Sequence, residues 1–308
     1  MTKRRLGRTE LFIHPLVLGC NVLGWTLEES AAAAVLDAFV GEGFTAFDTA
    51  DSYGKGKSET ILGNWIKSRG NRDKVLVFTK VGSDMGQGHR DLSARWIEEE
   101  VDASLRRLQT DHIDLYQTHW PDPNTPQEET LAALDRVVKA GKVRYIGSSN
   151  QDAALLTEAL AISKANGLAR YETIQNEFNL YDRAGFESVQ ETCIREEISG
   201  IGYFSLARGF LSGKYRSPAD AQKSPRGQAV VDKFLNPKGY RILDALDAVA
   251  GRTGASATEV SLAWIAAQPA VGAPIASATT VEQVESLARG ARLTLGAQDL
   301  AELTAAGK

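Results

Sequence analysis

The chain has 308 residues, with 35 Lys and Arg against 39 Asp and Glu, and a formal net charge of −4. This mildly acidic balance is not the basic type expected of a dedicated nucleic-acid-binding protein, and no apolar run is long enough to cross a bilayer. The length suits one α/β barrel, and 43% hydrophobic residues are enough for an ordinary soluble core.

The N-terminus and the cysteines favour a cytoplasmic protein. The charged start, MTKRRLGRTELF, is not followed by the apolar core of a secretory signal. Cys20 and Cys193 are the two cysteines and lie far apart in the sequence, so no disulfide framework is expected.

Short apolar runs alternate with amphipathic helical patterns along the chain. Several runs are nearly continuous, as in parallel strands that are covered on both faces. The predicted strands are residues 15–19, 44–49, 74–80, 112–119, 143–149, 172–178, 200–206 and 272–278. Eight strands that are each followed by a helix predict a closed (β/α)8 TIM barrel, with an open doubly wound sheet as the structural alternative.

Two further segments are expected around this barrel. Residues 4–14 resemble a short β-hairpin that would plug the bottom of the barrel. Residues 207–239 follow the seventh strand as a long loop rich in Gly, Pro, Ser and basic residues. No repeat or linker is visible, so residues 1–308 are expected to form a single domain.

Capping signals predict several helix ends. One helix is expected over residues 93–108, and another is expected to run from Asp152 to Asn166-Gly167. The predicted capping boxes are Thr125 to Glu128, with Pro126 in the first turn, Ser256 to Glu259, and Thr280 to Gln283.

Four polar side chains come at the ends of three neighbouring strands. Asp48 ends the second strand with Tyr53 just beyond it, Lys80 ends the third and His119 ends the fourth. Each alone is more readily explained as a loop cap, a solvated side chain or a packed histidine. Together, at the carboxyl ends of barrel strands, they favour one active site.

These four side chains could deliver a proton to a carbonyl oxygen. A tyrosine has an ordinary pKa of about 10, and an ammonium such as Lys80 lowers that pKa. Asp48 would hold Lys80, and His119 would donate a hydrogen bond to the carbonyl oxygen or relay a proton. The reaction also needs a hydride, which a nicotinamide cofactor supplies and no side chain does.

The Gly54-Lys55-Gly56 stretch is not a dinucleotide-binding loop, because Glu59 stands where that fingerprint needs a third small residue. We expect Gly54 and Gly56 to serve the turn into a helix that begins at Ser58.

The four polar residues carry a family resemblance. Asp48, Tyr53 in DSYGKGKSE, Lys80 in FTK and His119 in DLYQTHWPD resemble the catalytic tetrad of the aldo-keto reductase superfamily. The resemblance runs from RRLGRTELFIHPLVLG to APIASATTVEQVESL and includes GKVRYIGSSN, IQNEFNLYDR and LARGFLSGKY. It is nearer to the bacterial and potassium-channel β-subunit branch than to the steroid-metabolising branch.

The resemblance implies NADP(H), with NAD(H) as the alternative, bound extended across the barrel mouth. Ser149, Asn150 and Gln175 would bind the carboxamide, and Tyr203 would stack on the nicotinamide ring; otherwise Asn150 would merely cap the next helix. Residues along the pyrophosphate would be Leu206, Arg208, Gly209, Leu211, Gly213 and Lys214, and those near the adenosine 2′ position Ser277, Thr279 and Gln283.

Two positions depart from the family pattern. Tyr203-Phe204-Ser205-Leu206 stands where the family often has Tyr-Ser-Pro-Leu, and residues 277–283 lack the Arg or Lys often found there. Basic residues in the loop after the seventh strand could compensate, so NADP(H) is expected to bind more tightly than NAD(H); they are Lys214, Arg216, Lys223 and Arg226.

The leading interpretation is an oxidoreductase that reduces an aldehyde or ketone to an alcohol with NADPH, with Tyr53 as proton donor. A non-catalytic, redox-responsive partner subunit and a Schiff-base aldolase using Lys80 are the alternatives.

Trp25, Trp120 and Phe204 are expected to line the substrate pocket. The expected ligand is a small-molecule carbonyl, with no metal, nucleic acid or membrane; the oligomeric state is left open.

Overall fold

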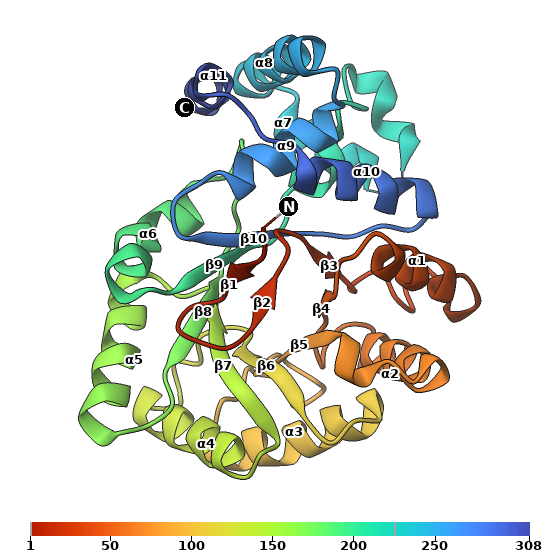
Figure 1. The fold of residues 1–308 in the computed structure, drawn as a ribbon. Coiled ribbons are helices and arrows are strands. Elements are labelled where there is room, and N and C mark those ends of the chain that lie inside the picture. Colours follow the sequence, from red (N-terminus) through yellow and green to blue (C-terminus); the bar gives the residue numbers. More distant parts are fainter. Residues whose placement is uncertain (1, 225) are drawn as a thin grey trace.

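The computed structural model describes residues 2–224 and 226–308. Within them, parallel strands close into a barrel in the order β10-β3-β4-β5-β6-β7-β8-β9. Their bounds are β3 Val17–Gly19, β4 Ala46–Asp48, β5 Leu76–Val81, β6 Ile113–Thr118, β7 Val143–Ser149, β8 Tyr171–Gln175, β9 Ser199–Gly202 and β10 Val271–Ala276. Each overlaps a predicted strand, so the (β/α)8 barrel is confirmed and the open sheet is wrong (Figure 1).

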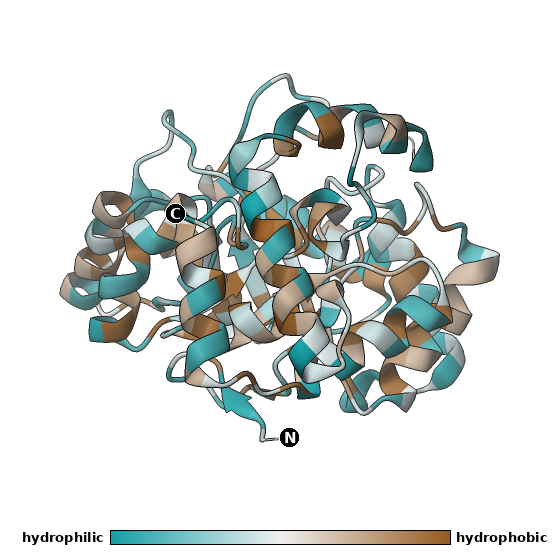
Figure 2. Ribbon diagram, turned by 90° about the horizontal axis from the view of Figure 1, so that it is seen from above, coloured by the Kyte–Doolittle hydropathy of each residue, from teal (hydrophilic) through white to brown (hydrophobic). Residues whose placement is uncertain are grey.

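Helices surround the barrel and turn their apolar faces inward (Figures 1 and 2). Their bounds are α1 Glu29–Gly41, α2 Lys57–Arg69, α3 Ala94–Leu108, α4 Gln127–Lys139, α5 Ala153–Asn166, α6 Ala184–Glu196, α7 Gly227–Phe234, α8 Pro237–Thr253, α9 Ala257–Ala266, α10 Val281–Arg292 and α11 Ala297–Ala306; a 3-10 helix, η1, covers Arg72–Lys74. In α3, Ile97, Val101 and Leu108 are buried in the core. This inward apolar stripe is what makes α3 a barrel helix.

Most predicted helix ends are confirmed, and two need correction. Ser93, Asp152 and Ser256 each cap their helix through the side chain. Thr125 does not cap α4, because its hydroxyl donates to Asp122 Oδ2 at 2.6 Å and the helix begins one residue later than expected. The helix predicted to begin at Ser58 begins instead at Lys57.

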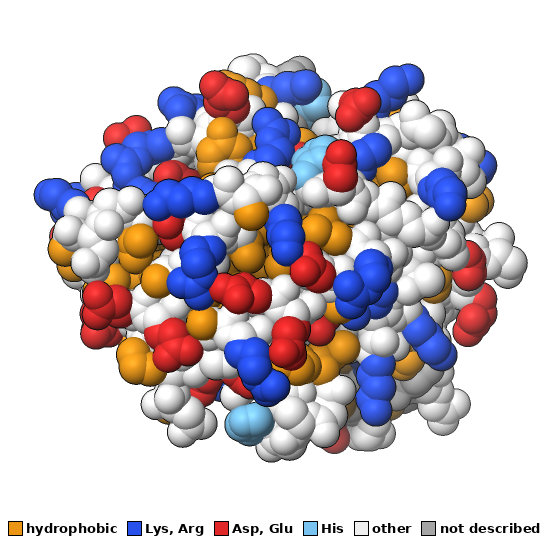
Figure 3. Space-filling model, turned by 90° about the horizontal axis from the view of Figure 1, so that it is seen from below, with side chains coloured by type: hydrophobic (Ala, Val, Ile, Leu, Met, Phe, Trp, Pro, Cys, Tyr) orange, Lys and Arg blue, Asp and Glu red, His pale blue; other side chains and the backbone are white. Residues whose placement is uncertain are grey.

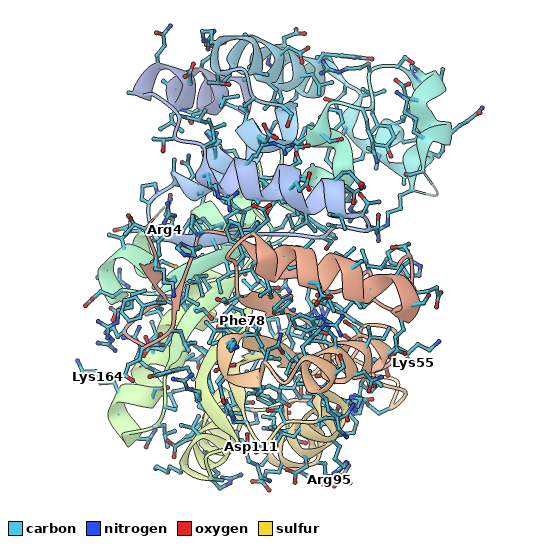
Figure 4. The ribbon with its side chains drawn as sticks, turned by 45° about the vertical axis from the view of Figure 1, so that its right-hand side comes forward. Arg4, Lys55, Phe78, Arg95, Asp111 and Lys164 are labelled. Carbon is cyan, nitrogen blue, oxygen red and sulfur yellow. The ribbon has the colours of Figure 1, made fainter. Side chains whose placement is uncertain are left out.

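The N-terminal hairpin closes one end of the barrel, as predicted. Strands β1 (Arg4–Arg5) and β2 (Phe12–Ile13) pair antiparallel and cross the barrel end that faces the viewer in Figure 1. Leu6 and Leu11 pack into the same interior cluster as Phe78, which Figure 4 labels inside the barrel. The opposite end, where the strands finish, is left as the mouth.

The segment after β9, expected as a long loop, is largely helical. It contains 3-10 helices η2 (Ala207–Ser212) and η3 (Pro218–Lys223), then α7 and the start of α8. Phe210, Tyr215 and Phe234 are fully buried and anchor it to the core. Its glycines and prolines obscured these short helices in the sequence.

The side of the molecule shown in Figure 3 carries intermixed acidic and basic side chains. Ion pairs such as Arg136 with Glu98 and Lys142 with Asp102 join α3 to its neighbours. Among the described residues, no helix combines the length and apolar character needed to span a membrane.

Candidate active site

A polar layer replaces the apolar core at the carboxyl end of the barrel. Side chains two residues apart on a strand share one face. On β5, Phe78 belongs to the interior apolar cluster and Lys80 follows it; on β6, Gln117 pairs with Lys80 in register. Asp48 ends β4 and Gln175 ends β8, so four strands contribute buried polar groups to one layer.

Lys80 connects the residues predicted as the catalytic set. Its Nζ donates to Asp48 Oδ2 at 2.6 Å, to the Thr49 carbonyl at 2.8 Å and to Tyr53 Oη at 3.3 Å. Lys80 is fully buried, whereas the Tyr53 ring reaches the cleft above it. The side chains of Asp48, Tyr53 and Lys80 therefore converge at the mouth.

Burial and neighbouring charges have opposite effects on the pKa of both Tyr53 and Lys80. Burial raises the pKa of Tyr53 and Lys80 lowers it, and burial wins. The sequence predicted that Lys80 lowers the pKa of Tyr53, but it did not predict the larger and opposite effect of burial. Burial lowers the pKa of Lys80, but Asp48 and Tyr53 outweigh it and the net direction is upward. Tyr53 is thus held as a neutral phenol beside an ammonium.

His119 completes the group from the end of β6. Its ring lies edge-on to Tyr53 with centroids 5.8 Å apart, and it stacks on Trp120. Burial lowers its pKa well below the ordinary value, and the charges of Lys80 and Arg90 add to this effect. Nδ1 lies 2.9 Å from Ser83 Oγ, which leaves Nε2 available for another partner.

A cleft of about 530 Å³ opens above these residues. Sixteen of the predicted site residues line it: Asp48, Tyr53, His119, Ser149, Asn150, Gln175, Tyr203, Leu206, Arg208, Gly209, Lys214, Arg226, Ser277, Thr279, Trp25 and Trp120. Phe204, predicted for the substrate side, lines it as well. The strand-end rule and the motifs thus converge on one cavity.

Four predicted site residues do not line the cleft. Lys80 and Leu211 are fully buried, Lys80 behind Tyr53 and Leu211 in the core. Gly213 ends η2 in a left-handed conformation. Gln283 accepts a hydrogen bond from Thr279 N at 2.8 Å; Thr280 caps α10, but Gln283 does not return the bond, so the third capping box forms only in part.

The residues expected around the carboxamide bond to one another. Ser149 Oγ donates to the Gln175 carbonyl, Asn150 Nδ2 donates to the His119 carbonyl, and Tyr203 Oη donates to Asn150 Oδ1. Asn150 has a left-handed backbone (φ 58°), and Asp152 caps α5, so the helix-cap interpretation of Asn150 is wrong.

Three basic side chains give the cleft its positive charge. Arg208, Lys214 and Arg226 line it, and each lies over an aromatic ring, those of Phe204, Tyr215 and Trp25 respectively. Within the described residues none of them pairs with a carboxylate, so all three charges remain available for an anion. A pyrophosphate-bearing cofactor fits this set together with the backbone amides around Gly209.

The other two basic residues of this segment are already paired. Arg216 forms a bidentate pair with Asp247, with both contacts at 2.7 Å. Lys223 pairs with Asp220 at 2.7 Å. Neither lines the cleft, which corrects the expectation that all four basic residues would compensate for the missing cation.

The departure from the family pattern at residues 203–206 coincides with unusual backbone. Phe204, Ala207 and Arg208 all have positive φ, at 51°, 46° and 58°. Non-glycine residues rarely adopt this region, and strain of this kind gathers at ligand-binding segments. Ser205 supports the turn by donating to the Gly202 carbonyl at 3.0 Å.

Sequence reasoning missed several residues that line the cleft. It also missed Gln117, which belongs to the buried polar layer. Asn21 and Val22 follow the first barrel strand, and Ile275 lies in the last, so the strand-end rule could have found them. Asn21 also accepts from Ser277 Oγ at 2.6 Å across the seam between these strands. Gln117 precedes His119 by two residues and so shares its face.

No cluster of three or more His, Cys, Asp or Glu suited to a metal occurs in residues 2–224 and 226–308. Cys20 and Cys193 are buried free thiols. Burial is also the main reason that the pKa of both thiols is raised.

Comparison with known proteins identifies the family of the chain. The model of the aldo/keto reductase family matches residues 15–308. Aldo-keto reductase YhdN of Bacillus subtilis (strain 168) is 36% identical over 296 residues, covering 92% of this chain and 86% of YhdN. Aldo-keto reductase yakc of Schizosaccharomyces pombe, named for NADP(+), is 31% identical over 278 residues, or 87% and 80% of the two chains.

A probable voltage-gated potassium channel subunit beta of Oryza sativa subsp. japonica is 32% identical over 299 residues, covering 92% of this chain and 89% of that subunit. The family match and these relatives cover nearly the whole length of the chain. The chain therefore belongs to the aldo/keto reductase family and is an oxidoreductase.

Proposed function

We propose that this protein reduces an aldehyde or ketone to an alcohol with NADPH, with Tyr53 as the proton donor, within one domain of residues 1–308. The observation that carries the proposal is Lys80 Nζ, which bridges Asp48 Oδ2 at 2.6 Å and Tyr53 Oη at 3.3 Å on the floor of the cleft. An acid and an anion-binding wall then face one cavity, with the cation that supports the acid directly behind it.

Each residue has a distinct part in the proposed reaction. Tyr53, held neutral by burial, gives its proton to the carbonyl oxygen, and Lys80 stabilises the phenolate that remains. Neutral His119 donates a hydrogen bond to the same oxygen through Nε2, in the tautomer whose Nδ1 accepts from the Ser83 hydroxyl. The nicotinamide cofactor, when bound, supplies the hydride to the carbonyl carbon.

Tyr53→Phe tests the assignment of the acid. We expect carbonyl reduction to fall by about 10² to 10⁴-fold, the usual size of general acid catalysis. NADPH affinity should stay within about threefold, because the phenol hydroxyl contacts the substrate oxygen. A panel of aldehydes and ketones, followed by loss of NADPH absorbance, gives the rates, and Tyr240→Phe on the surface is the control. Turnover near that of the wild type would remove Tyr53 from this role.

The preference for NADPH over NADH is proposed from the charged wall of the cleft. Residues 277–283 supply no cation, but Lys214 and Arg226 line the same cleft as Ser277 and Thr279. A charged donor to a phosphate contributes about 1.5–3 kcal/mol, so one such contact is enough to favour the 2′-phosphate.

Fluorescence titration of matched variants tests this preference. Arg226→Gln and Lys214→Gln probe the two available cations, and Lys223→Gln, which removes a paired cation outside the cleft, is the control. We expect at least one of the first two to weaken NADPH about tenfold or more while changing NADH much less. Equal affinities of the wild type for NADPH and NADH would overturn the preference.

The aldolase alternative is disfavoured by the state of Lys80. A Schiff-base lysine attacks as a neutral amine, whereas Lys80 is buried, donates three hydrogen bonds and has a raised pKa. The channel-subunit relative keeps a redox-responsive partner role as the second candidate. Cofactor binding without turnover of any carbonyl in the panel would favour that second role.

A further inference from the structure

We propose that Gln117 is a positioning residue of this site: it braces Asp48 and Gln175 together beneath the cleft and so sets the contact between Lys80 and Tyr53. The functional part of the proposal rests on the carbonyl reduction proposed above. Gln117 is completely buried and does not line the cleft, so it would act through its neighbours.

The hydrogen bonds define a three-membered brace. Asp48 Oδ1 accepts from Gln175 Nε2 at 2.8 Å and from Gln117 Nε2 at 3.3 Å, while Oδ2 is left to Lys80. Gln117 Oε1 also accepts from Gln175 Nε2 at 3.4 Å. A carboxylate accepts only, so the nitrogen of Gln117 must face Asp48 and its oxygen must face Gln175.

The brace also fixes what Gln175 presents to the cleft. Both N–H groups of its side chain point to protein acceptors, one to Asp48 and the other to Gln117. Its oxygen Oε1 accepts no hydrogen bond from the described residues, and Gln175 lines the cleft. The bond from Gln175 Nε2 to Asp48 Oδ1 at 2.8 Å sets this orientation of the amide, and the 3.4 Å contact with Gln117 Oε1 supports it.

The barrel wall keeps Gln117 in place. Gln117 pairs in register with Gly147 of β7. A Cβ on Gly147 would lie 3.2 Å from Gln117 Cγ and 2.2 Å from Thr173 Oγ1. The bare backbone of β7 therefore makes the space that the glutamine side chain fills.

Removing the brace would act on Tyr53 through Lys80. A buried ion pair is favourable only when its remaining lone pairs are hydrogen-bonded. Without Gln117, Asp48 Oδ1 loses one of its two donors and keeps the bond from Gln175 Nε2 at 2.8 Å. The less constrained carboxylate can then draw Lys80 Nζ away from Tyr53, whose 3.3 Å contact is the longest of the three made by Nζ. The phenol would then lose part of its cationic support.

The titration of Tyr53 reports this change. The groups that act on Tyr53 are Lys80 from β5, Asp48 from β4 and Cys20 after β3, with the His119 ring edge-on beyond β6 and Tyr203 after β9. Among them Lys80 is the cation that favours the phenolate, so a longer Lys80–Tyr53 distance moves the titration to higher pH.

The experiment compares Gln117→Met, which keeps the volume and removes the amide, with Gln117→Glu, which keeps the shape and removes the donor to Asp48. Ser148→Ala on β7 is the control, since its buried hydroxyl has no partner among the described residues. Ultraviolet titration of tyrosinate, with Tyr53→Phe subtracted, gives the midpoint for Tyr53. The pH profile of kcat for alcohol oxidation gives the corresponding midpoint in the enzyme–substrate complex.

For Gln117→Met we expect both midpoints to rise by about half a unit to one unit, and kcat for reduction at neutral pH to fall about three- to tenfold. NADPH Kd and carbonyl KM should stay within about threefold. Gln117→Glu should shift the midpoints at least as far, because its charge would face Asp48.

Profiles of Gln117→Met that overlay the wild type, or an equal shift in Ser148→Ala, would overturn the proposal. Loss of folding in both Gln117 variants would also overturn it and assign Gln117 to barrel stability alone. If the wild type reduces no carbonyl, the proposed function fails, while the ultraviolet titration still decides whether Gln117 sets the Lys80–Tyr53 contact.

Discussion

The protonation states at the mouth follow from burial as much as from neighbouring charge. Burial raises the pKa of Tyr53 more than the ammonium 3.3 Å away lowers it, so Tyr53 is a phenol well beyond neutral pH. His119 stays neutral because burial and two cations all lower its pKa. Lys80 stays charged because Asp48 and Tyr53 overcome the effect of burial. An acid, a neutral donor and a cation therefore coexist at neutral pH in contact with one another.

Asp51 is a buried carboxyl with a separate, structural effect. It is completely buried, its Oδ2 has no partner among the described residues, and its pKa is raised well above the ordinary value by burial and by Glu59 and Glu100. The folded chain therefore holds a proton on Asp51 that the unfolded chain releases above about pH 4. The contribution to stability is lost as pH rises through the raised pKa of the folded state.

Asp51→Asn should remove this pH dependence. The amide resembles the neutral acid and keeps an oxygen for the Ser52 N–H, which donates to Oδ1 at 2.5 Å. We expect the free energy of unfolding of the variant, relative to wild type, to increase from pH 5 to pH 8 by roughly 1 kcal/mol or more. Urea unfolding at both pH values measures it, with exposed Asp244→Asn as control. A difference that does not change with pH would show that Asp51 is not proton-linked to folding.

At the scale of helices and strands, local signals predicted helix ends well where no other partner competed for the capping side chain. Ser256 and Glu259 form the predicted capping box at α9, and Glu259 in turn accepts from Arg289 of α10 at 2.8 Å. Thr125 carries the same signal at α4, but Asp122 is near enough to take its hydroxyl. Turn partners of this kind compete with capping, and the sequence pattern alone does not rank them.

Ser256→Ala tests the contribution of the capping box at α9. Loss of the bond to Glu259 N, which is 3.3 Å long, should cost about 1 kcal/mol in unfolding free energy. Ser256→Asn should retain most of the stability, because its side-chain oxygen can still accept that bond. Calorimetry gives the difference, and Thr125→Ala provides the comparison with a threonine that does not cap. Equal losses for Ser256→Ala and Ser256→Asn would contradict the assignment.

For the whole molecule, barrel topology explains what could be predicted. A closed parallel barrel brings the ends of all its strands to one face, so the strand-end positions of Asp48, Tyr53, Lys80 and His119 were enough to group them. Which side chains bond to one another could not be predicted in this way. Only the fold shows that Arg216 is bound by Asp247, and only the register reveals Gln117 beside Asp48. The short helices of residues 207–239 depend on buried anchors such as Phe210 and Phe234, which local sequence does not identify.

The cleft is built from both ends of the chain, so a ligand that fills it should stabilise the fold as a unit. Its walls include Asn21 after β3, Tyr53 after β4, Arg208 and Arg226 after β9, and Ser277 after β10. A ligand present at 100 times its Kd, and bound only by the folded state, adds about 2.7 kcal/mol. For a chain of this length, that corresponds to a rise in Tm of about 4 °C.

NADPH should produce this shift, and NADH at the same concentration a smaller one. Adenosine 2′,5′-bisphosphate, which lacks the nicotinamide half, should stabilise the wild type and Gln117→Met by the same amount, because Gln117 lies below the side of the cleft where we propose that the nicotinamide binds. Differential scanning fluorimetry measures all three ligands on both proteins. The absence of any shift with NADPH at saturating concentration would contradict cofactor binding to this cleft. A loss of the bisphosphate shift in Gln117→Met would mean that the substitution disturbs the whole mouth rather than the brace.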